Sequence, residues 1–114
     1  MNIVIVEKTI PLEELKTVAQ EFYKTMIKGV VDIEQEIVVF GGEYHIDANT
    51  KLIEHGSRQN DVWGFNVYLD KPREHWLEYI SLINIRPQDK NYDMEVKDLK
   101  IRERMKKIID SKII

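Results

Sequence analysis

Three acid–base side chains alternate along a short segment that follows a pair of glycines. Glu43, His45 and Asp47 lie two residues apart in the phrase GGEYHIDA. In an extended chain, alternate side chains project from one face, so two carboxylates and an imidazole would lie together. Such a set can bind a divalent metal ion or transfer protons. The spacing permits a metal site or an acid–base set of these three residues. Hydrogen bonding at a strand–helix junction is the preferred interpretation, because Asp47 is also suited to cap a following helix.

The polar loop SRQND follows and adds further candidates. Ser57 and Gln59 are candidate ligand contacts, and Asp61 joins Glu43 and His45 as a candidate catalytic group. Loops this polar carry binding sites when a rigid scaffold holds them. A hydrolase triad of Ser57, His45 and Asp61 is disfavoured, because the sequence pairs no base with the serine.

Asn66, Asn84 and Arg86 interrupt runs that are otherwise hydrophobic. A guanidinium group is always charged, so burying it requires an acceptor. Two interpretations stay open: an internal network that holds the loops to the sheet, or a pocket in which Arg86 binds an anionic ligand. The candidate ligand-binding residues are Ser57, Gln59, Trp63, Asn66, Asn84 and Arg86.

Hydrophobic periodicity and turn residues predict the elements that position these side chains. Apolar residues at three- and four-residue spacing predict a first helix from Pro11 to Lys28, ended by Gly29. Strict alternation predicts a strand over 62–69, and a segment apolar on both faces predicts a central strand over 76–86. The other expected elements are a strand over 3–6, a hairpin over 30–40 turning near 34–36 (or one bent strand), a short helix within 47–55 capped by Asp47, a short edge strand over 94–96 and a helix over 98–112.

This order, β-α-β-β-α-β-β-α, predicts an α+β fold. Short hairpin connections favour a mainly antiparallel sheet of four to five strands, with three helices on one side. The length of 114 residues fits one domain spanning the chain.

Composition excludes several classes of function. There is no cysteine, which removes disulfides and thiolate chemistry and fits a reducing cytoplasm. No apolar stretch is long enough for a signal peptide or a membrane span, so we expect a soluble protein. The net charge of −3 argues against a dedicated nucleic-acid binder. The basic C-terminal helix is the exception, with Lys97, Lys100, Arg102, Arg104, Lys106 and Lys107 against Asp98 and Glu103.

Three phrases, GGEYHIDA, GSRQNDVWGFNVY and SLINIRPQDKN, resemble those of a family of small prokaryotic proteins described as a domain of unknown function. The resemblance covers nearly the whole chain, from the helix at Pro11 to the basic C-terminal helix. It implies no activity, substrate or cofactor. It does place the polar candidates named above, together with Pro87, within the family's typical phrases. Tyr44 and Ile46 depart from the smaller or aliphatic residues of the usual first phrase.

The sequence therefore favours a small binding or regulatory domain that uses the polar residues around Arg86 for an anionic or polar ligand or a partner chain. The alternative is a metal-dependent hydrolase or nuclease-like enzyme built on Glu43, His45 and Asp47. No cofactor is identified apart from the divalent metal of that alternative. Homo-oligomerisation stays open.

Overall fold

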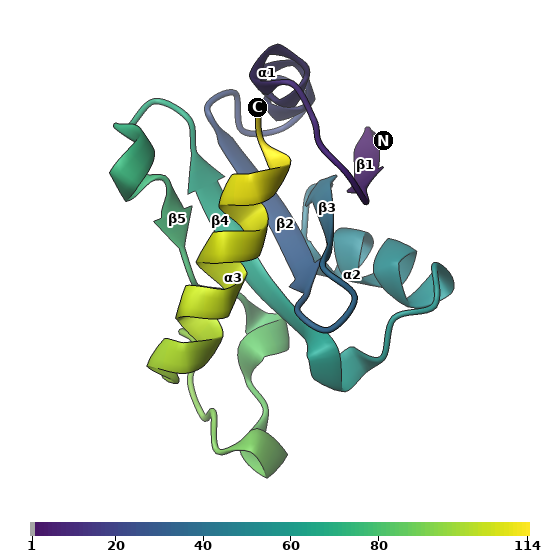
Figure 1. The fold of residues 1–114 in the computed structure, drawn as a ribbon, viewed down its shortest axis with the longest axis vertical. Coiled ribbons are helices and arrows are strands. Elements are labelled where there is room, and N and C mark those ends of the chain that lie inside the picture. The colour runs from purple at the N-terminus through teal and green to yellow at the C-terminus, as the bar shows by residue number, and fades with distance from the viewer. Residues whose placement is uncertain (1) are drawn as a thin grey trace.

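One antiparallel sheet of five strands forms the centre of the fold, with three α-helices packed on it (Figure 1). The computed structural model describes residues 2–114. The strand order across the sheet is β1-β3-β2-β4-β5, and each neighbouring pair is antiparallel. The predicted α+β class and element order are thereby confirmed. The elements are β1 (Ile3–Val6), α1 (Leu12–Ala19), β2 (Met26–Asp32), β3 (Ile37–Gly41), α2 (His45–Glu54), β4 (Val62–Tyr68), β5 (Leu77–Glu78) and α3 (Leu99–Lys112).

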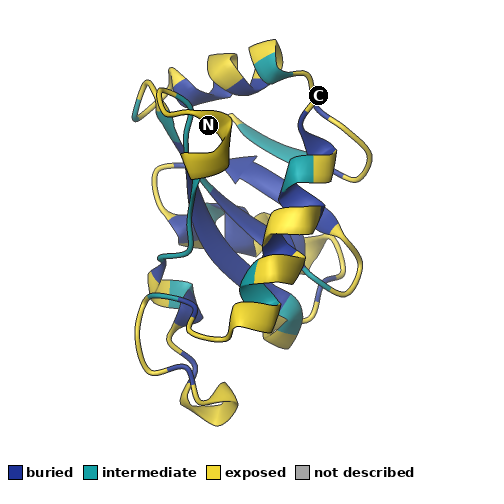
Figure 2. Cartoon of the chain, turned by 60° about the vertical axis from the view of Figure 1, so that its left-hand side comes forward, coloured by how far each residue is buried: buried dark blue, intermediate teal, exposed yellow. Residues whose placement is uncertain are grey.

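The helices cover both faces of the sheet, so the expectation of helices on one side is wrong. On one face, Val31, Phe40 and Phe65 pack with the apolar residues of α1 and α3, and α3 crosses the front of the sheet in Figure 1. On the other face, Val30 and Val39 pack with the buried residues of α2. The central strands β2, β3 and β4 are accordingly largely buried while the outer sides of the helices face solvent (Figure 2). Two apolar faces on one sheet require a cover on each side.

β2 and β3 form a hairpin, which confirms the preferred interpretation of residues 30–40 over one bent strand. The buried carboxylate of Asp32 accepts hydrogen bonds from the backbone N–H groups of Glu34 and Gln35, both at 2.9 Å. Glu36 has a left-handed backbone conformation, with φ of 58°. The Asp32 side chain therefore organises the turn, as Asp does in Asx-turns.

The first helix is shorter than predicted, because α1 ends at Ala19 and β2 already begins at Met26. Lys24 reverses the chain with φ of 65°. Met26, Ile27 and Lys28 then pair with β4 opposite Tyr68, Val67 and Asn66. The apolar spacing of this segment suits a helix as well as a strand, and long-range pairing decides between them.

The predicted central strand over 76–86 is also wrong. Only Leu77–Glu78 forms β5, at the edge of the sheet. The chain then folds over β4 as a short 3₁₀ turn, Leu82–Asn84, and Leu82 and Ile85 are exposed rather than buried. The expected edge strand over 94–96 is reduced to an isolated bridge between Ile80 and Glu95.

The remaining predicted elements are confirmed. β1 and β4 lie where alternation and β-branched residues placed them. Asp98 caps α3 through hydrogen bonds from Lys100 N–H at 2.8 Å and Ile101 N–H at 3.4 Å. Among residues 2–114, no helix combines the length and apolar character needed to cross a bilayer.

Candidate functional site

Arg86 lies inside the protein, with 4% of its surface exposed. Its guanidinium donates hydrogen bonds to the backbone carbonyls of Asn60, at 2.9 Å, and Val62, at 2.5 Å. The same group lies 4.0 Å from the ring centroid of Trp63 and 3.7 Å from the carboxylate of Asp89. Of the two interpretations of Arg86, these contacts support the internal network.

The other polar candidates near Arg86 are also paired within the protein. Asn84 accepts a hydrogen bond from Gly64 N–H at 2.8 Å and donates to Gly64 O at 3.0 Å. Ser57 Oγ donates to the Asp32 carboxylate at 2.6 Å. Gln59 forms a reciprocal amide pair with Asn49, at 2.8 and 2.9 Å. These contacts tie loops to the sheet.

Glu43, His45 and Asp47 do not share one extended face, so the geometric premise of the metal trio is wrong. α2 begins at His45, two residues before the expected Asp47 cap. The Asp47 carboxylate instead accepts hydrogen bonds from the N–H groups of Glu43, at 3.1 Å, and Tyr44, at 3.0 Å. Asp61 lies elsewhere, next to β4, where its backbone carbonyl accepts from Ile33 N–H. Within the described part of the chain, no group of three acidic or histidine side chains is arranged to hold a metal ion.

His45 and Asn66 meet instead at a cavity of about 480 Å³ between α2 and the segment 80–83, which we call the α2 pocket. Its floor is the face of β2 and β4 that α2 leaves uncovered. Lys28 and Asn66 are register partners there, as are Met26 and Tyr68. This volume lies within the range of about 300–1,000 Å³ found for small-molecule sites.

Large apolar side chains form the two walls of the pocket. Tyr44 and Ile46 rise from the start of α2, and Leu82 and Met94 face them from the segment after β5. All four are exposed to solvent. The remaining lining residues are Ile80, Ser81 and Ile83. Clustered exposed apolar side chains in a soluble protein usually mark a binding surface.

His45 contributes a neutral imidazole to the pocket. Its Nε2 lies 2.8 Å from the carbonyl oxygen of Phe65. Because a carbonyl only accepts, Nε2 carries the proton of the neutral ring and Nδ1 is left as an acceptor. Burial lowers the pKa of His45, and the positive charge of Lys28 lowers it further, while hydrogen bonding of the ring to the acceptors of Phe65 and Asn66 opposes this shift. The ring is therefore uncharged at pH 7.

Asn66 has an acceptor that the protein leaves unused. Its Nδ2 donates to the Glu78 carboxylate at 2.8 Å and to Ile80 O at 3.2 Å, so the orientation of the amide is set by two acceptors. Its Oδ1 is buried and accepts no hydrogen bond while His45 is neutral; a protonated His45 would supply the donor, which is why Asn66 raises the pKa of His45. Buried polar atoms without partners are rare and costly.

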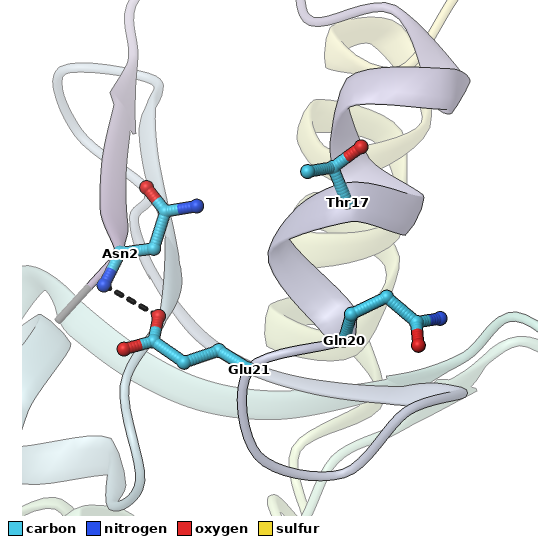
Figure 3. A pocket seen from close by; sticks show the side chains of 4 residues that line it. All are labelled: Asn2, Thr17, Gln20 and Glu21. Atoms are coloured by element: carbon cyan, nitrogen blue, oxygen red, sulfur yellow. Dashed lines mark hydrogen bonds between the residues drawn. The ribbon is translucent and has the colours of Figure 1, made fainter.

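A second depression, of about 550 Å³, lies between α1 and the N-terminal segment. Figure 3 shows Thr17 and Gln20 on the side of α1, and Glu21 reaching the backbone N–H of Asn2, a hydrogen bond of 2.5 Å. These four polar residues are its whole lining. An open polar depression offers little apolar surface for a ligand to bury, so the α2 pocket is the stronger candidate.

The basic residues of α3 are mostly engaged with their own chain. Arg102 pairs with Glu95 at 3.0 Å, and Lys106 with Asp110 at 2.8 Å. Arg104 donates to the carbonyl of Ile33 at 2.8 Å. This arrangement is that of a solvated helix face with local ion pairs.

Of the predicted site residues, the structure brings His45 and Asn66 together in one pocket and places the rest elsewhere. Sequence reasoning missed Lys28, Tyr68 and the exposed apolar walls. The alternation over 62–69 did place Asn66 and Tyr68 on one face of β4. Lys28 was missed because its segment was assigned to a helix.

One family model matches the chain, over residues 4–112, and its description is protein of unknown function (DUF5674). No curated protein matches the chain. No solved structure matches it either.

Proposed function

Because the chain belongs to the DUF5674 family, whose description names no activity, we propose its function from the site itself: a small-molecule-binding domain whose ligand occupies the α2 pocket. The observation that supports this proposal is the pairing of exposed apolar walls with a polar floor. Small-molecule sites combine mostly apolar lining with a few polar groups that orient the ligand.

Burial of the walls supplies the driving force for binding. Removing apolar surface from water contributes roughly 25 cal/mol per Å². Tyr44, Ile46, Leu82 and Met94 are exposed without a ligand, so an apolar molecule between them would cover all four. The backbone around them is held by short contacts, including the hydrogen bonds of Asn84 to Gly64. A largely preformed pocket loses little conformational entropy when it binds.

The proposed site differs from the one expected around Arg86. The guanidinium of Arg86 is enclosed by Asn60, Val62 and Trp63. Lys28, His45 and Asn66 take its place as the polar groups that a ligand would meet.

The test uses N-phenyl-1-naphthylamine, an uncharged probe whose fluorescence rises in apolar surroundings. We expect saturable binding to the wild-type protein. Leu82→Ser removes one apolar side chain from a wall and should weaken binding about tenfold, the loss expected from roughly 1.4 kcal/mol of apolar contact.

Leu99→Ser is the matched control, because Leu99 is exposed to the same extent as Leu82 (68% and 70%) but does not line the pocket. It should bind the probe as the wild type does. Absence of saturable binding, or equal weakening by the two variants, would reject the proposal.

A further inference from the structure

The α2 pocket is lined by a positively charged side chain and by no carboxylate among the described residues. Its only charged lining residue at neutral pH is Lys28, and no Asp or Glu from residues 2–114 lines it. The chain as a whole is acidic, with 20 acidic residues against 17 basic ones. A low-dielectric cavity with a single cation strengthens the attraction of an incoming anion.

Lys28 has an aromatic neighbour but no carboxylate partner among the described residues. Lys97 and Lys106 lie within 3.0 Å of a carboxylate oxygen. Lys28 forms no ion pair with any described residue, and its Nζ lies 5.4 Å from the ring centroid of Tyr23. Its positive charge is therefore not neutralised by a described carboxylate.

Asn66 links an anion at Lys28 to the protonation of His45. It is the register partner of Lys28 on the pocket floor, and 6% of its surface is exposed. Its buried Oδ1 accepts no hydrogen bond while the His45 ring is neutral. Hydrogen bonding by this side chain favours a protonated His45, whereas burial and Lys28 oppose it. An anion beside Lys28 would offset the effect of the lysine's positive charge on His45. The protonated ring could then donate a hydrogen bond to Asn66.

We propose that the α2 pocket is specific for small amphipathic acids, with the carboxylate beside Lys28 and the apolar body between the walls formed by Ile46 and Leu82. This inference rests on the proposed function, since it requires a ligand in the pocket. It adds the class of ligand: a monocarboxylic acid with an aromatic or aliphatic body. An uncharged molecule of the same shape uses the walls but gains nothing from Lys28.

The experiment compares 2-naphthoate with 2-naphthamide, which share a ring system and differ in charge. Isothermal titration calorimetry at pH 7.5 should give at least about tenfold tighter binding of the acid to the wild-type protein, the range expected for a charge-assisted contact. Lys28→Met should abolish this preference while leaving the affinity for the amide unchanged.

Lys100→Met is the control, because it makes the same change in net charge on α3, outside the pocket. It should preserve the preference for the acid. Equal affinities for acid and amide in the wild type, or equal losses in the two lysine variants, would overturn anion selection and leave the apolar pocket standing. Failure of both compounds and of N-phenyl-1-naphthylamine to bind would overturn both proposals.

Discussion

Lys28 and Asn66 face each other across β2 and β4, on the floor of the α2 pocket. The ammonium of Lys28 has no carboxylate partner among the described residues, and Oδ1 of Asn66 has no donor while His45 is neutral. Elsewhere the buried polar side chains are paired, as Arg86 and Ser57 show. A cation without a carboxylate and a buried acceptor coupled to His45, in register on the floor of a cavity, distinguish this site from the network around Arg86.

His45 should make the stability of the protein depend on pH. Its pKa is lower in the folded protein than the ordinary value near 6.5, so its contribution is present above pH 6.5 and is lost as the pH falls. We expect the free energy of unfolding, measured with urea, to decrease between pH 7.5 and pH 5.0. His45→Gln should flatten this dependence. The same slope in the variant would show that other groups cause it.

Binding of the acid should have the opposite pH dependence. Lys28 from β2 and Glu78 from β5 are the charged groups that act on His45, and an anion at Lys28 offsets the lysine's effect. The pKa of His45 should therefore rise on binding, and affinity for 2-naphthoate should increase from pH 7.5 to pH 5.5, where a carboxylate is still ionised. The affinity for 2-naphthamide should stay level, and His45→Gln should remove the trend. If the affinity for the acid did not change with pH, the link between ligand binding and protonation of His45 would be contradicted.

Arg86→Met should destabilise the protein by about 2–4 kcal/mol without changing the affinity for 2-naphthoate. The substitution leaves the carbonyls of Asn60 and Val62 without a donor and removes the contact with Trp63. Arg104→Met is the comparison, because exposed Arg104 donates to one carbonyl at the surface and should cost under about 1 kcal/mol. Urea denaturation measures both. Weaker ligand binding in a fully folded Arg86→Met protein would restore the anion site expected from the sequence.

Gly64→Ala should displace the segment that forms one wall of the pocket. A Cβ at this position would lie 2.5 Å from the Cβ of Ser81, so the segment must shift or the protein loses stability. Gly56→Ala is the control: φ is 107°, but no neighbouring atom lies within 4 Å of its Cβ. We expect about 1 kcal/mol of destabilisation for Gly56→Ala, and for Gly64→Ala a larger loss with weaker binding of N-phenyl-1-naphthylamine. Normal probe binding by Gly64→Ala would show that the wall is not held by this contact.

Local patterns in the sequence were enough to predict the elements in which one signal dominates. Alternation along 62–69 predicted β4 and the face that carries Asn66, and Asp98 before an apolar stripe predicted the start of α3. The segment 76–86 failed because apolar composition was equated with burial, whereas Leu82 lies largely in solvent. A binding wall and a buried strand have similar composition, so the pattern could not separate them.

The candidate site depended on information that no local pattern contains. Lys28 belongs to the floor only because β2 pairs with β4 in one register, with Lys28 opposite Asn66. His45 was identified, but on the assumption of an extended chain, and the start of α2 points it toward Phe65. Arg86 was correctly flagged as a residue that needs acceptors. Those acceptors are backbone carbonyls, which have no signature in the sequence.

The side chains after β5 also close the open border of β4. β5 pairs with β4 only at Asn66 and Val67, so the backbone of β4 from Val62 to Gly64 has no fifth strand beside it. The Asn84 amide occupies the N–H and C=O of Gly64, and the Arg86 guanidinium occupies the carbonyl of Val62. A strand from another molecule would find these backbone hydrogen-bonding groups already occupied. The side chains of Asn84 and Arg86 thus prevent intermolecular β-pairing along this part of β4. Such pairing is a route by which exposed strands aggregate.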